Sequence, residues 1–282
     1  MESTNMELHA SKHRNSSRTA TNRGRLWAAS ALSALLFGAP AFAHKTFLAS
    51  ERHLWGSGDT VEVELTSALE FPNIEYGPTL DRISFTSVLV ANTQVQNVAF
   101  EEGQTALTVS FEAAESGFSV VAMSTHPRSG EISPEGAAAY FDEIDAELAV
   151  RQAFEDLPGS PPLNRSYSKH TKVFLCVDTC ERGQEARQTP LGQALEFVGV
   201  ADEARSFALV RHGEAVANQR VTIYSDRGEH TAAVTDERGV VRVDPSFSGV
   251  VLLSAIWITA PDEPSGVYHS DQATLTVLIP TS

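Results

Sequence analysis

The segment Val61-Glu62-Val63-Glu64-Leu65 decides the fold class, because every second side chain in it is apolar and the side chains between are acidic. A strand places successive side chains on opposite faces, so this alternation directs valine and leucine to a core and glutamate to water. The segment Leu107-Thr108-Val109-Ser110-Phe111 repeats the pattern. We therefore predict a mainly β protein built from half-buried strands.

Similar short segments continue on both sides of these two, separated by turn residues such as Gly56, Gly58 and Gly103. Several strands at this regular spacing are typical of a β-sandwich. The predicted strands of the first part of the chain are 45–49, 60–66, 82–90, 95–101, 105–112, 118–124 and 167–177.

One region has a helical period instead. Ser133 and Pro134 form a helix start, with a capping hydroxyl followed by a proline at the first helical position. An apolar stripe then runs from Tyr140 through Leu148. Pro158-Gly159 ends it, so we predict one helical insertion at about 134–156.

The last ninety or so residues return to strands alone. Seven short strands in this length suggest an immunoglobulin-like or transthyretin-like sandwich. We therefore predict two β-sandwich domains, an N-terminal one at 44–185 that carries the helix and a C-terminal one at 186–282. The predicted C-terminal strands are 194–198, 206–211, 220–225, 230–234, 240–243, 250–258 and 273–279.

Residues 1–43 have the pattern of a signal peptide. Arg23 and Arg25 precede an apolar stretch at 26–37, and Ala41-Phe42-Ala43 supplies the small residues of a cleavage site. An uncleaved anchor is the alternative, but the apolar run is shorter than the ~20 residues that span a membrane. We expect cleavage after Ala43, a periplasmic location and no membrane insertion afterwards.

The chain is acidic, with a formal net charge of −15. Residues 1–43 contain five of the 21 basic side chains but only two of the 36 acidic ones, so the remainder is more acidic still. Such a surface repels phosphate backbones and attracts cations. We therefore expect no nucleic-acid partner, and the charge is compatible with metal handling or with simple solubility.

Cys176 and Cys180 are the only cysteines. Outside the cytoplasm two thiols this close form a disulfide most simply, although a thiolate metal site or a redox role is the alternative. In an extended chain their Cα atoms would lie roughly 13 Å apart, too far for a disulfide. A Cys176–Cys180 disulfide therefore predicts a turn at 177–179.

A family resemblance spans nearly all of the chain after residue 43. It is carried in order by Ala43-His44, Glu70-Phe71-Pro72, Asp81-Arg82, the helix after Ser133, Tyr167-Ser168-Lys169-His170-Thr171-Lys172 and Ala273-Thr274-Leu275-Thr276-Val277. In this order the segments resemble an uncharacterised periplasmic family labelled a nickel/cobalt uptake component. The resemblance implies two β-sandwich modules, a metal ligand at the position of His170 and a membrane metal transporter as partner.

Histidines are the candidate metal ligands. Cleavage after Ala43 would give His44 a free amine beside its imidazole, which makes a pair of nitrogen donors. With His170 it would form a three-nitrogen site for nickel or cobalt, or for copper, which such ligands bind most tightly. Reserve candidates, each also readable as an ordinary surface or core residue, are His126, His230, His269 and Asp271.

Two classes of function remain open. The first is a periplasmic transition-metal-binding accessory protein that assists nickel or cobalt uptake. The second is a non-catalytic envelope module that binds a membrane transporter or another protein without metal. The chain contains no Gly-x-Ser-x-Gly and no His-Glu-x-x-His motif, so we expect no enzyme activity, with oxidative copper chemistry the only enzymatic alternative.

Overall fold

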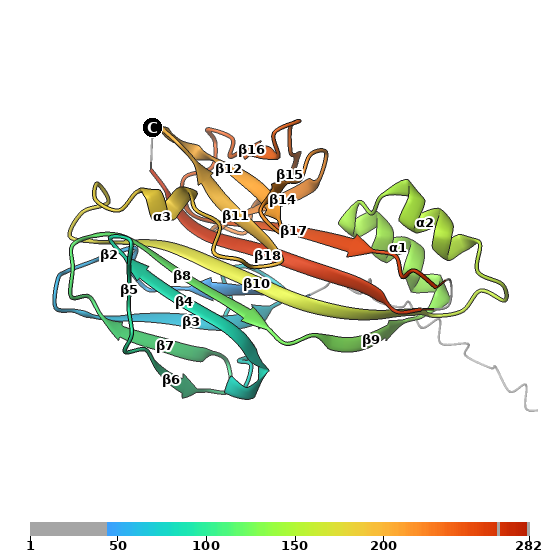
Figure 1. Ribbon diagram of the computed structural model, residues 1–282, viewed down its shortest axis with the longest axis horizontal. Helices are drawn as coiled ribbons and strands as arrows, with labels where there is room; N and C mark the ends of the chain where they lie inside the picture. The colour runs from blue at the N-terminus through green and yellow to red at the C-terminus, as the bar shows by residue number, and fades with distance from the viewer. Residues whose placement is uncertain (1–43, 264–265, 281–282) are drawn as a thin grey trace, which may run out of the picture. The chain divides into compact units, whose positions relative to one another are not determined.

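Strands dominate the structure, as the alternating segments predict. The computed structural model describes residues 44–263 and 266–280, and the predicted signal peptide 1–43 lies outside the described residues. The described strands form three sheets. In Figure 1 the longest strands lie in the middle, with a smaller sheet on either side.

The first small sheet contains the alternating segment 61–65. Val61, Val63 and Leu65 are buried, whereas Glu62 is exposed. The four strands are antiparallel, in the order β1-β3-β7-β6, with bounds Lys45–Ala49 (β1), Thr60–Ala68 (β3), Leu107–Glu112 (β7) and Ala99–Glu102 (β6).

The central sheet has ten strands and is built around β10 (Leu163–Val177). β10 pairs in parallel with β18 (Tyr268–Ile279) and antiparallel with β8 (Gly117–Thr125). The other strands are Leu54–Trp55 (β2), Ile83–Val90 (β4), Thr93–Gln94 (β5), Arg128–Ile132 (β9), Arg220–Ser225 (β14), His230–Val234 (β15) and Gly249–Thr259 (β17).

The second small sheet covers the opposite face of the central sheet (Figure 1). Its strands are Leu195–Val200 (β11), Glu203–Arg211 (β12), Glu214–Ala215 (β13) and Val240–Arg242 (β16). β10 contributes to both cores, because Val173 and Leu175 pack toward β3 and β7 while Phe174 and Cys176 pack toward β11 and β12. The central sheet is thus one layer of two sandwiches.

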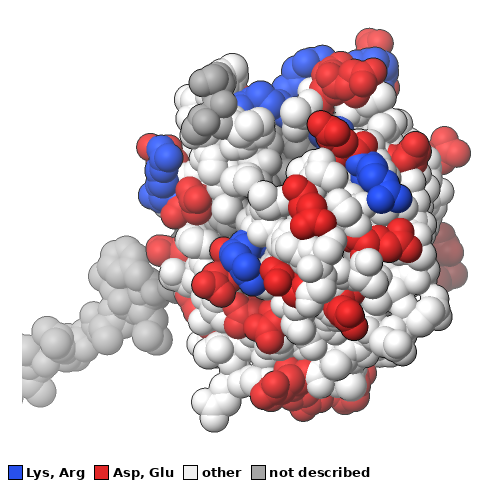
Figure 2. All heavy atoms as spheres, turned by 90° about the vertical axis from the view of Figure 1, so that its left-hand side faces the viewer, with Lys and Arg blue, Asp and Glu red and all other residues white. Residues whose placement is uncertain are grey.

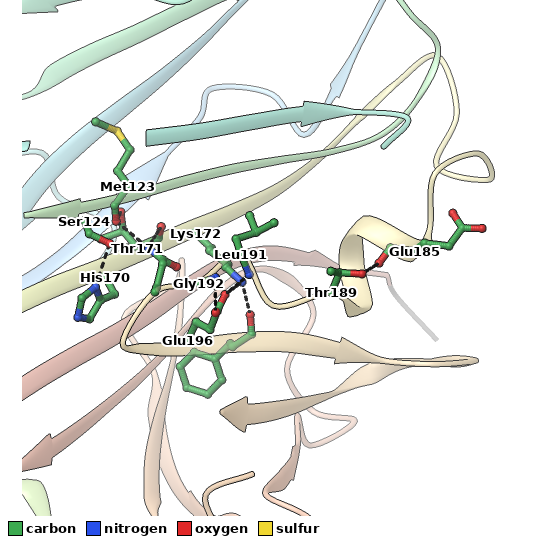
Figure 3. Close-up of polar contacts among 12 residues, drawn as sticks. Met123, Ser124, His170, Thr171, Lys172, Glu185, Thr189, Leu191, Gly192 and Glu196 are labelled. Atoms are coloured by element: carbon green, nitrogen blue, oxygen red, sulfur yellow. Dashed lines mark hydrogen bonds and ion pairs between the residues drawn. The ribbon is translucent and has the colours of Figure 1, made fainter. Parts of the chain in front are cut away.

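An ion pair lies inside the second sandwich. The Nζ of Lys172 on β10 donates to Oε2 of Glu196 on β11 and, at 3.1 Å, to the carbonyl of Phe197. The two Glu196 oxygens also accept the backbone N–H groups of Leu191 and Gly192, at 2.8 and 3.0 Å (Figure 3). Burial lowers the pKa of Lys172, and the charge of Glu196 and its hydrogen bond oppose that shift.

The helical insertion lies where the sequence predicts but contains two helices, Pro134–Ile144 (α1) and Leu148–Glu155 (α2). Asp145 has a positive φ of 51° and ends α1. The break lets Phe154 of α2 fold back onto Phe141 of α1, with ring centroids 5.5 Å apart.

Two shorter helices are Leu80–Arg82 (η1) and Glu185–Gln188 (α3). No helix among the described residues has the length and apolar character needed to cross a membrane.

The two cysteines close a tight turn at the end of β10. Cys176 and Cys180 are joined by a disulfide with their Cα atoms 5.0 Å apart. Asp178 has a positive φ of 55°, and the N–H of Thr179 donates to the carbonyl of Val177 at 2.6 Å. The turn that a disulfide at this spacing requires is therefore present.

The predicted domain boundary between residues 185 and 186 falls at the start of α3. Strands from both sides of it share the central sheet, since β10 pairs with β18 over nine residue positions from Arg165 to Val173. The two predicted sandwiches therefore have a sheet in common.

Glu196→Gln is expected to lower the free energy of unfolding by about 3–5 kcal/mol, because it leaves the buried Lys172 charge unpaired. Urea unfolding monitored by tryptophan fluorescence measures this. Arg238→Gln, which breaks an exposed pair with Asp236, is the matched control and is expected to cost at most about 1 kcal/mol. Equal losses for the two variants would contradict the importance of the buried pair.

Candidate functional site

A basic groove of about 770 Å³ lies at the start of β1. We call it the His44 groove. Four of its lining side chains are cationic, and among its described lining residues none is acidic. It is lined by His44, Thr46, Ser67, Tyr76, Gly77, Pro78, Thr79, Arg82, Thr125, Arg128, Arg165, Tyr167 and Lys169.

One wall of this groove is formed by alternate side chains of β10. Alternate side chains of a strand share a face, so Arg165, Tyr167 and Lys169 line the groove together. Arg128 joins them because β9 pairs antiparallel with β10, with Arg128 opposite Tyr167. Arg82 is the last residue of η1.

Lys169 is half-buried and occupies the inner end of the groove. Its Nζ donates to Oε1 of Gln272 at 2.7 Å and to the carbonyl of His44 at 3.4 Å. Burial, together with the positive charge of Arg165, lowers the pKa of Lys169 to about 7, although the charge of Glu143 acts against this. A bound anion would stabilise the protonated form of this amine.

Aromatic rings hold Arg165 in place. Its guanidinium lies over the rings of Tyr140 and Tyr167, at 4.6 and 4.8 Å from their centroids, and donates to the Tyr140 hydroxyl at 2.9 Å. Its Nε is buried and has no hydrogen-bond partner among the described residues. His44 stands at the groove edge-on to Tyr76, with ring centroids 5.7 Å apart.

The four basic side chains of the groove form no ion pair with a carboxylate among the described residues, although the charge of Glu143 acts on Lys169. These side chains are Arg82, Arg128, Arg165 and Lys169. Acidic side chains predominate on the face shown in Figure 2, as expected for a chain of net charge −15. Four basic side chains gathered in one groove without an acidic lining residue favour an anion there.

His170 faces the other side of the central sheet. Its Nδ1 lies 2.9 Å from Oγ of Ser124, and its Nε2 lies 3.0 Å from Oδ1 of Asp271. Because Gln193 donates to the Ser124 oxygen at 3.0 Å, the hydroxyl can donate to Nδ1, which places the ring proton on Nε2 toward Asp271. Figure 3 shows His170 and Ser124 side by side.

The same carboxylate also receives His269, whose Nε2 lies 3.2 Å from Asp271 Oδ1. Burial would raise the pKa of Asp271, but the hydrogen bonds and charges of His170 and His269 outweigh it and lower the pKa. The Ser124, His170 and Asp271 chain resembles a hydrolase triad in composition. Ser124 is only 5 % exposed and already binds Gln193, so the arrangement supports a structural role.

The structure brings together some of the predicted metal ligands and separates others. His170, His269 and Asp271 meet at one carboxylate oxygen. His44 and His170 do not meet, because Lys169 points to His44 and the next side chain of the strand points to the opposite face. Of the other two candidates, His126 is exposed after β8 and its carbonyl accepts from Arg82 of the groove at 2.8 Å, whereas His230 lies on β15 beside Tyr224.

Within residues 44–263 and 266–280, no group of three or more His, Cys, Asp or Glu side chains is arranged to hold a metal ion. Both ring nitrogens of His170 are engaged, and His269 is the more accessible partner, with 41 % of its side chain exposed. The two histidines of the predicted three-nitrogen site lie at different places, His44 at the groove and His170 in the buried network on the other face of β10.

Comparison with protein families gives a match over most of the chain. Residues 41–259 match the family described as a domain of unknown function, DUF4198. The chain belongs to this family. The match spans β1 through β17, so it includes the lining of the His44 groove and the pair of His170 and Ser124, whereas His269 and Asp271 on β18 lie beyond it.

Other comparisons add little. No curated protein matches this DUF4198 chain. A solved structure with some similarity is the adhesin InvE of Yersinia pseudotuberculosis, at 12 % identity and a TM-score of 0.21. The aligned region covers 84 % of this chain and 61 % of that one, and at this TM-score the likeness carries no argument.

Three groove residues, Arg128, Arg165 and Tyr167, were not among the site residues predicted from the sequence, although Tyr167 stands in a segment that carries the family resemblance. The sequence does contain a signal for Arg165 and Tyr167. Large cationic or aromatic side chains alternate with serines in the segment Arg165-Ser166-Tyr167-Ser168-Lys169. That alternation places the large side chains on one face. The contribution of Arg128 depends on strand pairing and has no such signal.

Lys169→Met is expected to raise the free energy of unfolding below pH 7 and to lose this advantage as the pH rises. Wild-type Lys169 is deprotonated above about 7 in the folded chain but stays protonated up to about 10.5 when unfolded, so wild-type stability increases over this range. The slope is at most about 1.4 kcal/mol per pH unit.

Urea unfolding from about pH 6 to about pH 9 checks this prediction, with the exposed Arg227→Met as control. A difference between Lys169→Met and wild type that stays constant with pH would contradict the lowered pKa of Lys169.

Proposed function

We propose that this protein is a non-catalytic binding protein of the cell envelope and that it holds a small anionic ligand in the His44 groove. The observation that carries the proposal is the convergence of four basic side chains on one groove of an acidic chain, with no acidic side chain among the described residues that line it. Guanidinium groups match carboxylate and phosphate geometry, so Arg82, Arg128 and Arg165 suit either ligand.

The groove also has apolar surface for the body of such a ligand. Tyr76 and Tyr167 contribute rings beside the cations, and Tyr167 already stacks on Arg165. Small-molecule sites in proteins combine apolar walls with a few placed polar groups. The periplasm remains the proposed location, since residues 1–43 have the pattern of a cleavable signal peptide.

A role in nickel or cobalt uptake is a second candidate, and the position of His44 favours it. His44 would be the first residue after cleavage at Ala43, and it is exposed at the groove. Without His170 beside it, this residue supplies at most its amine and one ring nitrogen. A membrane metal transporter would be the partner in this case.

Arg128→Gln is expected to weaken anion binding about tenfold, the effect of losing one charge-assisted hydrogen bond. Arg128 is the variant of choice because it is exposed and lines the groove at one edge. Isothermal titration of residues 44–282 with citrate, and separately with inorganic phosphate, measures the affinity. The wild-type affinity is expected to fall as salt is added.

Arg227→Gln removes an exposed charge from a turn outside the groove and is the matched control. It is expected to leave anion affinity unchanged. The proposal fails if the wild-type chain shows no saturable binding of either anion, or if the two variants weaken binding equally.

A further inference from the structure

Lys169 differs from the three arginines of the His44 groove because its amine can become a nucleophile. A guanidinium stays protonated in proteins, whereas a lysine amine loses its proton more readily when it is buried or lies beside another cation. Lys169 has both features, since it is half-buried and Arg165 lines the groove from the same face of β10. The charge of Glu143 acts in the opposite direction, but Lys169 forms no ion pair with a carboxylate of the described chain.

The hydrogen bonds of this amine leave its lone pair free. Nζ of Lys169 donates to Oε1 of Gln272 at 2.7 Å and to the carbonyl of His44 at 3.4 Å. A neutral primary amine has two hydrogens, and these two contacts use both of them. Both acceptors are uncharged, so neither favours the protonated amine as strongly as a carboxylate would. The lone pair of the neutral amine is therefore available to attack a bound ligand.

The amine and Arg165 lie over the same aromatic ring. The Nζ of Lys169 is 5.5 Å from the centroid of the Tyr167 ring, and the guanidinium of Arg165 is 4.8 Å from it. The Nε of Arg165 is buried and has no hydrogen-bond partner among the described residues, so it has a donor left for a carboxylate oxygen. One short ligand that crosses Tyr167 would reach both the nucleophile and a carboxylate-binding group.

We propose that the ligand of the His44 groove is a small oxo acid, which Lys169 binds as a reversible imine. The Nζ lone pair forms a bond to the carbonyl carbon, the carbon–oxygen bond breaks, and the oxygen leaves as water with the two amine hydrogens. Water reverses the step, and neither an oxidant nor a reductant is needed. Arg165 and Arg128 hold the carboxylate end. This inference rests on the proposed anion-binding function and names the ligand class of that site.

Reductive trapping tests for the imine. Residues 44–282 contain every lining residue of the groove, and they are incubated with 2-oxoglutarate and sodium cyanoborohydride, which reduces an imine to a stable secondary amine. This stretch has only three lysines, Lys45, Lys169 and Lys172. Intact mass counts the adducts and peptide mapping locates them. We expect one main adduct, on Lys169. Acetone has the carbonyl without the carboxylate, so it should label Lys169 more slowly than 2-oxoglutarate does.

Lys45 is the matched control within the same chain. Burial lowers the pKa of Lys45 as well, but the charges of Glu143, Glu70 and Glu75 act against that shift. We therefore expect 2-oxoglutarate to label Lys169 at least about tenfold faster than Lys45. An excess of citrate should protect Lys169 and leave the labelling of Lys45 unchanged.

Two variants complete the test. Lys169→Arg keeps the positive charge and removes the nucleophile, so it should lose the main adduct, whereas Lys45→Arg should keep it. The comparisons within the wild-type chain hold even if a variant does not fold. Equal labelling of Lys169 and Lys45, or equal labelling of Lys169 by acetone and 2-oxoglutarate, overturns the inference. If citrate binds in the titrations and Lys169 is not trapped, the imine is wrong and the anion-binding function stands. If neither anion binds and Lys169 is not trapped, both proposals fail.

Discussion

The buried pair of Lys172 and Glu196 is the constraint on which the arrangement of the layers depends. Lys172 is 2 % exposed and Glu196 is 1 % exposed, so neither charge is tolerable without the other. The carboxylate also receives two backbone N–H groups from the loop before β11, which leaves it fully satisfied. One buried ion pair therefore links β10 of the central sheet to β11 of the sheet that covers it.

The two faces of β10 line different parts of the protein because its side chains alternate. On one face Arg165, Tyr167 and Lys169 line the groove. Further along the same face, Val173 and Leu175 pack in the core between the central sheet and the sheet of β3 and β7. On the other face His170 and Lys172 form buried polar contacts. Further along that face, Phe174 and Cys176 pack in the core between the central sheet and the sheet of β11 and β12. A strand buried on both sides can thus support a binding groove and a structural network at adjacent positions.

The His44 groove differs from most of the chain in the sign of its charge. Most of the chain carries excess negative charge, which repels anions, yet four cations meet where no described lining side chain is acidic. Burial and, after it, the charge of Arg165 lower the pKa of Lys169, and a bound anion would favour its protonated form. This local excess of basic side chains is the feature on which the proposed anion site rests.

The sequence by itself determined the local features of this protein. Alternation in segments such as 61–65 gave the strands, Ser133-Pro134 gave the helix start, and the spacing of Cys176 and Cys180 required the turn that is present. Tertiary structure alone decided that β10 and β18 pair in parallel across about a hundred residues, that both sandwiches share one sheet, and that His44 and His170 lie on opposite faces. The physical reason is range: a period within a segment records which side chains share a face, whereas the partner of a strand is set by packing between segments far apart in the chain.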